Sequence, residues 1–191
     1  MNLDCLNRLD QVPETKRAIN AAIRSYEGQR FWFNETATAL TLSAGQSYVN
    51  FPSDFLILDE IQVTISSADY ALIGRSFAEI KELNTTRTRS QPEYFCQYGQ
   101  RFELAPIPDS AYPVIVSYMQ KLPPLSADSD TNDWLSAAED VIVYCAAKLV
   151  AANLGRADEA SKFANLEMVF YNNLMGLRDQ KALTHIRPTK F

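Results

Sequence analysis

Histidine, cysteine and glycine are scarce in this sequence. Its 191 residues include one histidine, His185, three cysteines far apart and six glycines. A single histidine with no acid close to it in the sequence argues against a catalytic triad or a proton shuttle. Cys5, Cys96 and Cys145 show no C-x-x-C spacing, which argues against a zinc site. We expect them to be free thiols in a reducing compartment.

Three further absences exclude other classes of protein. The glycines are scattered singly, so neither a phosphate-binding loop nor a G-x-S-x-G nucleophile turn is present. No run approaches about 18 apolar residues, and the first ten residues carry acids without an apolar stretch, so we expect neither a membrane span nor a secretory signal. Lys and Arg total 18 against 23 Asp and Glu, a net charge of −5. A nucleic-acid-binding module is expected to be basic, so that function is disfavoured.

Apolar residues make up 47% of the chain, which is enough for a sizeable core. Pro13 predicts the start of a helix, since proline is favoured at the first helical position. This helix places Asn20 on a polar face and has one apolar face: Ile19, Ala22, Ile23 and Tyr26. Residues 2–10 favour a short preceding helix. The aromatic run Phe31-Trp32-Phe33 cannot point in one direction, so at least one of its rings is expected to face a partner.

The stretch from about 38 to 122 is predicted to form strands. Apolar residues alternate with polar ones around Ile61, around Phe102 and around Val116, the period of half-buried strands. By this alternation Glu103 faces solvent. Tyr98-Gly99-Gln100 predicts a hairpin, and Ser76 with Glu79 forms a capping-box pattern that predicts a short helix over 76–83.

Helical patterns return after Pro123-Pro124. A helix is predicted to start either at a Ser136–Glu139 capping box or earlier, at Asn132 or Asp133. Residues 141–154 are apolar on nearly all sides, which predicts burial on several sides and hints at subunit contact. Gly155 is a plausible helix stop. The last helix has one predicted apolar face: Phe163, Leu166, Phe170, Leu174 and Leu177.

Few residues are candidates for chemistry. Asp128, Asp130, Asn132 and Glu139 match positions of a calcium loop, but Asp133 stands where the template needs glycine, so an acidic loop is favoured. A small hydrolase could use Asp59, Glu60 or the acids of 128–139. Asp59 and Glu60 are disfavoured as a catalytic pair, because neighbours on a strand point to opposite faces.

The loop around Arg87 and Arg89 carries several hydroxyl side chains. Such a loop is suited to contacts with DNA phosphates or with a protein partner. Two arginines are too few to drive DNA binding alone, because affinity scales with the number of phosphates neutralised.

Several segments, taken in order, resemble one family. Arg30-Phe31-Trp32-Phe33-Asn34-Glu35 after the first helix, Phe51-Pro52-Ser53-Asp54-Phe55, the strand from Gly99 to Asp109, and Asn132-Asp133-Trp134-Leu135 are similar to head-to-tail adaptor proteins of tailed bacteriophages. The resemblance runs from about residue 15 to 180.

The predicted fold is α+β. An N-terminal helical segment (1–37) and a C-terminal helical pair (124–181) form a bundle, an antiparallel β-rich region (38–123) is inserted, and an extended tail arm (182–191) follows. The expected subunit-interface residues are Trp32, Val143 and Tyr144, and Arg87 and Arg89 are a possible DNA or partner contact. The portal-docking arm that the resemblance implies comprises Ile186, Arg187, Pro188, Lys190 and Phe191.

The resemblance implies a structural virion protein, not an enzyme, without cofactor or metal. Its partners would be the portal protein, a nozzle or tube protein of the tail, and other copies of itself in a ring of about twelve. Genomic DNA would pass through the channel without sequence-specific binding, which suits an acidic wall. The expected location is the head–tail junction, after assembly in the host cytoplasm. The alternatives are another neck or tail-completion protein, such as a stopper or tail-tube component, and the small hydrolase.

Overall fold

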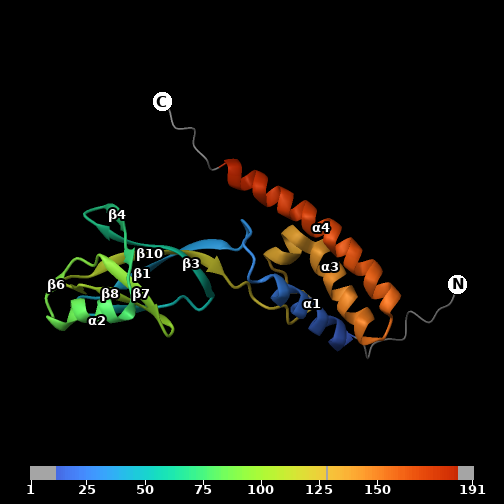
Figure 1. Cartoon of the computed structure of the whole chain (residues 1–191), viewed down its shortest axis with the longest axis horizontal. Helices are drawn as coiled ribbons and strands as arrows, with labels where there is room; N and C mark the ends of the chain where they lie inside the picture. Colours follow the sequence, from blue (N-terminus) through green and yellow to red (C-terminus); the bar gives the residue numbers. More distant parts are fainter. Residues whose placement is uncertain (1–11, 128, 185–191) are drawn as a thin grey trace. The chain divides into compact units, whose positions relative to one another are not determined.

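A computed structural model describes residues 12–127 and 129–184. The predicted helix over 2–10 and the predicted tail arm from 185 onward lie outside these residues. The chain divides into two compact units (Figure 1). The helical unit combines the described residues of Met1–Asn34 and Leu122–Phe191, and the β unit is Glu35–Lys121. The α+β class with an N-terminal helix packed on a C-terminal helix pair is confirmed.

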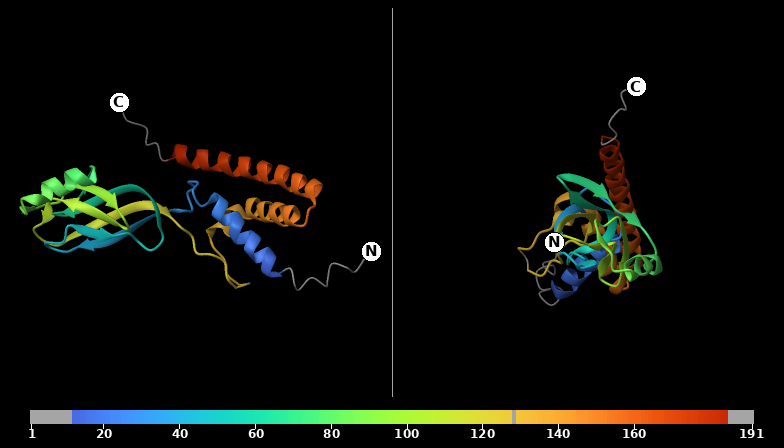
Figure 2. Two further views of the ribbon diagram at one scale, coloured as in Figure 1. Left: turned by 60° about the horizontal axis from the view of Figure 1, so that its bottom comes forward. Right: turned by 90° about the vertical axis from the view of Figure 1, so that its left-hand side faces the viewer.

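Three helices build the helical unit, and the middle one contacts both others (Figure 2). They are α1 (Val12–Tyr26), α3 (Asp133–Asn153) and α4 (Ala157–Thr184). The apolar face predicted for α1 is the face that packs, because Ala22 and Ile23 are fully buried. Asn20 departs from the prediction: its side chain exchanges two hydrogen bonds, of 2.8 and 3.1 Å, with the backbone of Leu125. These bonds attach the loop before α3 to α1.

The start of α3 follows the earlier of the two predicted positions. The Asn132 side chain caps the helix by accepting a hydrogen bond from the Leu135 N–H at 3.3 Å. The Ser136–Glu139 capping box is wrong: the Ser136 hydroxyl donates to the Asn132 carbonyl instead. A non-helical residue, Ala138, bends the helix here.

Gly155 ends α3 as predicted. Its φ is +70°, and its N–H and that of Arg156 bond back to the carbonyls of Ala152 and Ala151. This pair of bonds is the Schellman arrangement, which needs a left-handed residue after the helix.

Two four-stranded sheets pack face to face in the β unit and share one apolar core. Their orders are β1-β10-β3-β4 and β2-β8-β7-β5, and a third, two-stranded sheet pairs β6 with β9. The strands are β1 (Glu35–Leu42), β2 (Tyr48–Asn50), β3 (Phe55–Ile65), β4 (Ala68–Ala71), β5 (Ile73–Gly74), β6 (Arg89–Ser90), β7 (Tyr94–Tyr98), β8 (Arg101–Ala105), β9 (Ile107–Pro108) and β10 (Tyr112–Gln120). Pairing is antiparallel except for the short β5–β7 and β6–β9 pairs, which are parallel.

Helix α2 (Phe77–Thr85) contacts β7 and β8 and packs Ile80 against Cys96 and Ala105. It carries the predicted Ser76–Glu79 capping box, and the predicted hairpin joins β7 to β8 with Gly99 at φ +62°. Glu103 was predicted to face solvent, but it is buried and paired with Arg101 at 2.5 Å. The ion pair supplies the partner that a buried carboxylate requires.

Candidate functional site

A buried polar network joins the three helices of the helical unit. Glu167 of α4 accepts a hydrogen bond from the Tyr26 hydroxyl of α1 at 2.6 Å, and its other carboxylate oxygen forms an ion pair with the Lys148 ammonium of α3. Glu167 is buried, so both of its oxygens are satisfied inside the protein. One side chain thus fixes the rotation of α4 against both of its neighbours.

The ionisation of this network follows from its contacts. Burial alone would raise the pKa of Glu167, but the hydrogen bonds from Lys148 and Tyr26 outweigh it and hold the pKa below its ordinary value. Burial and the bond to Glu167 raise the pKa of the Tyr26 hydroxyl well above its usual range. At neutral pH Glu167 is therefore a carboxylate and Tyr26 a neutral phenol.

The predicted apolar face of α4 is wrong in part, and the network explains why. Glu167 and Leu174 are buried, whereas Leu166 and Leu177 are 40% and 50% exposed. The buried face of α4 is turned toward Glu167, because its ion pair and hydrogen bond must be made inside. Leu166 and Leu177 are left at the flank of the helix.

An exposed apolar surface results on one side of α3 and α4, and we call it the α3–α4 surface. Val143, one of the expected subunit-interface residues, is 48% exposed. The ring of Tyr144 stacks on Phe170, with centroids 5.2 Å apart, and lies 6.4 Å from Phe163. The members of the α3–α4 surface are Val143, Tyr144, Phe163, Leu166, Phe170 and Leu177.

The three rings of the aromatic run after α1 lie in two different environments, as expected for consecutive residues. Phe31 and Phe33 stack on one another at 5.2 Å and both contact the buried Trp134. Trp32 is partly buried, and the Lys181 ammonium lies 4.0 Å from the centroid of its ring in a cation–π contact. Trp32 thus connects the segment after α1 to the last turn of α4.

The β unit has a second exposed group of side chains, which we call the β-unit patch: Ile73, Arg75, Leu83 and Tyr94. Ile73 pairs with Tyr94 between β5 and β7, and the Arg75 guanidinium lies 5.2 Å above the Tyr94 ring. Arg75, Leu83 and Tyr94 line one hollow of about 480 Å³, together with Glu79, Glu82 and Thr86. Sequence reasoning missed this patch, because only the β5–β7 pairing brings Ile73 beside Tyr94.

A comparison with family models gives a match over residues 3–188, to a family described as SU10 adaptor protein. The chain belongs to the SU10 adaptor protein family. It is a phage adaptor protein, so its role is structural, and the family resemblance found in the sequence is confirmed. The comparison with curated proteins gave no match.

For an SU10 adaptor, contact surfaces matter more than reactive groups. Of the acids considered for chemistry, Asp128 lies outside the described residues. Asp59 lies in a β-bulge, so the alternation predicted for Asp59 and Glu60 fails and both are exposed. Asp130 accepts hydrogen bonds from the N–H groups of Ser126 and Ala127, which hold the pKa of its carboxyl below the usual value. Within 12–127 and 129–184, no group of metal-binding side chains is found.

The remaining expected contact residues of this adaptor are placed as follows. Arg87 and Arg89 are both exposed at the start of β6, and Arg87 has a positive φ of 52°. The Arg89 guanidinium lies close to Gly45. The docking arm expected at Ile186–Phe191 lies outside the described residues. No described helix is long and apolar enough to cross a membrane.

Proposed function

We propose that this adaptor forms a ring of about twelve copies that binds under the portal protein, extends the DNA channel and presents the docking surface for the tail. Membership of the SU10 adaptor family supports an architectural role at the junction of virion parts. The α3–α4 surface carries the ring proposal, because exposed aliphatic side chains backed by an aromatic stack are typical of protein contacts. The net charge of −5 suits a channel wall that must not hold DNA.

The ring interface is tested by charge substitution on the α3–α4 surface. Val143→Asp places a carboxylate where a neighbouring subunit would bury it, so we expect the variant to fold but to fail to join rings on portal. Asn172→Asp, on an exposed part of α4 away from this surface, is the matched control. Native mass spectrometry of each protein mixed with portal measures the outcome. Normal rings formed by folded Val143→Asp would contradict this assignment.

The tail-docking surface is assigned to the β-unit patch. Tyrosine, arginine and isoleucine or leucine side chains around a hollow form the kind of anchor set found at protein interfaces. Leu83→Asp is expected to weaken binding of the tail nozzle or tube protein by about tenfold or more and to leave ring formation intact. Surface plasmon resonance with portal-bound rings measures this, with Glu60→Gln, at an exposed position of β3 outside the hollow, as the control. Equal binding of the tail protein by both variants contradicts the assignment.

The segment 184–191 is assigned to the portal. Its sequence, Thr-His-Ile-Arg-Pro-Thr-Lys-Phe, combines two apolar anchors with two positive charges, and Pro188 favours an extended chain. Eight extended residues reach roughly 26 Å, enough to lie along a neighbouring protein. A stopper or tail-tube protein would not join the portal first. The order of assembly in a mixture of portal, adaptor and tail protein therefore distinguishes the proposal from its alternative.

A further inference from the structure

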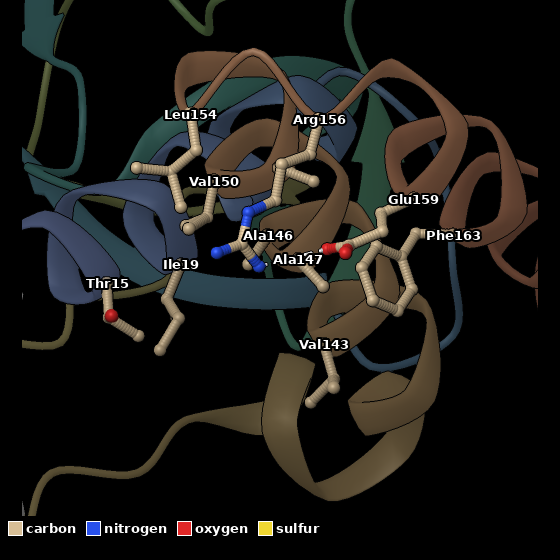
Figure 3. A pocket seen from close by; sticks show the side chains of 11 residues that line it. Thr15, Ile19, Val143, Ala146, Ala147, Val150, Leu154, Arg156, Glu159 and Phe163 are labelled. Atoms are coloured by element: carbon tan, nitrogen blue, oxygen red, sulfur yellow. Dashed lines mark hydrogen bonds and ion pairs between the residues drawn. The ribbon is translucent and has the colours of Figure 1, made fainter. Parts of the chain in front are cut away.

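A groove runs along α3, bordered by α1 on one side and by the first turns of α4 on the other (Figure 3). Its floor is one face of α3, since the lining residues recur at a spacing of three and four. Its volume is about 370 Å³. The lining residues are Thr15 and Ile19 of α1; Val143, Ala146, Ala147, Val150 and Ala151 of α3; Leu154; and Arg156, Glu159 and Phe163.

The groove is mostly apolar and is as long as a short helix. Arg156 and Glu159, its charged lining residues, pair with one another at 3.3 Å. Leu154 is 40% exposed at one end, and alanines form the floor. From Val143 to Leu154 the floor is about 17 Å long at the helical rise. The helices α1, α3 and α4 therefore leave an apolar strip beside the small side chains of α3, on which the side chains from one face of a short helix can pack.

The chain before α1 is the segment within reach of this groove. α1 begins at Val12, one turn before Thr15, which lines the groove. The C-terminal segment is remote, because α4 carries the chain roughly 32 Å from Phe163 to Thr184 at the helical rise. Seven extended residues after Thr184 span only about 24 Å.

The sequence of residues 1–11 fits such a groove. Leu3, Leu6 and Leu9 recur every three residues, so a helix would place them along one side. A helix over 2–10 would be about 14 Å long, close to the length of the floor. We propose that residues 1–11 of the same chain occupy the groove as a fourth helix, with the three leucines against Ala147, Val150 and Leu154.

With residues 1–11 in the groove, the helical unit has one covered apolar surface and one accessible apolar surface. The segment 1–11 covers the groove from Ala147 to Leu154, near the α3–α4 turn, whereas Val143, Tyr144, Leu166 and Leu177 stay accessible. This placement of residues 1–11 rests on the groove, on the length of the chain before α1 and on the spacing of its three leucines. It does not depend on whether the protein forms rings or binds the portal.

The native Cys5 allows a direct test in the full-length protein. Val150→Cys places a thiol in the groove, and a disulfide forms only if the two Cα atoms come within about 7 Å. Cys96 and Cys145 are buried and do not compete. We expect mild oxidation of Val150→Cys to join Cys5 to the introduced thiol within one chain, at a rate independent of protein concentration. The control is Gln180→Cys, an exposed position near the far end of α4 where no such bond is expected.

The outcomes separate the possible occupants. A disulfide-linked dimer in place of the intramolecular bond assigns the groove to a second copy and overturns the proposal, as does equal crosslinking in the control. Leu6→Asp should slow the intramolecular bond by about tenfold, because it removes apolar burial, whereas Asn7→Asp should not. Removal of residues 2–10 should also raise hydrogen exchange in 146–154. Unchanged exchange there overturns the proposal even if the Val150→Cys variant folds poorly.

Discussion

Replacing Glu167 with glutamine tests the network that fixes the three helices. The substitution keeps the shape of the side chain and an oxygen that accepts the Tyr26 hydrogen bond, but it removes the charge that pairs with Lys148. Breaking a fully buried ion pair costs about 3–5 kcal/mol, because the remaining charge is left uncompensated. The Lys148 side chain is 32% exposed and is partly hydrated. We therefore expect a loss of about 2 kcal/mol, near the value of a hydrogen bond to a charged group.

The two tryptophans allow the stability of the helical unit to be measured separately from that of the β unit. Trp32 and Trp134 both lie in the helical unit, so their emission reports the unfolding of that unit during a urea titration. A loss of about 2 kcal/mol also lowers the melting temperature by roughly 4–8 °C in a chain of this size.

Two further variants test the origin of the loss. Glu159→Gln removes the exposed partner of Arg156 and should cost less than about 0.5 kcal/mol. Adding Lys148→Met to Glu167→Gln should restore part of the lost stability, because no charge is then left unpaired. Equal stability of the Glu167→Gln and Glu159→Gln variants would refute the reasoning.

Changes at Glu167, Gly155, Trp32 and the segment 184–191 have further expected effects on stability or binding. The pKa of Glu167 lies below its ordinary value of 4.5, so its contribution to stability is complete above that pH. This contribution is lost as the pH falls through the folded-state pKa, so the stability gap between wild type and Glu167→Gln should close on acidification through that pKa. Gly155→Ala should cost about 1 kcal/mol in urea unfolding, because φ there is +70°. Trp32→Ala should cost about 1–2 kcal/mol, less than a core tryptophan, since its ring is partly exposed beside Lys181. Deletion of 184–191 should leave the melting temperature unchanged and strongly weaken portal attachment in a pull-down; unchanged attachment contradicts the docking role.

Elements whose signals are local could be predicted from the sequence. The helix after Pro13, the Ser76–Glu79 capping box, the hairpin at Gly99 and the helix stop at Gly155 depend on residues within a few positions of one another. Backbone geometry and capping chemistry decide such features before any tertiary packing is considered. The α+β class followed from their order.

Features that depend on long-range packing could not be predicted in this way. A glutamate amid the apolar residues of α4 gives no sign that it is buried, since its partners lie 19 and 141 residues away. Once Glu167 turns inward, Leu166 must turn outward, which apolar periodicity alone does not reveal. The role of Asn20 at the Leu125 backbone, 105 residues away, is likewise invisible locally.

The pairing of β1 with β10 has a consequence for how such chains can diversify. Glu35, the first residue of the β unit, is the ladder partner of Met119, two residues before its end. Facing residues of an antiparallel pair have Cα atoms about 4.5–5.5 Å apart. The two ends of the inserted β unit therefore lie side by side. A bridge of a few residues could replace the whole insertion, or another small fold with adjacent ends could take its place, without opening the three-helix scaffold. Exchange of this kind would let one scaffold be fitted to differently shaped partners.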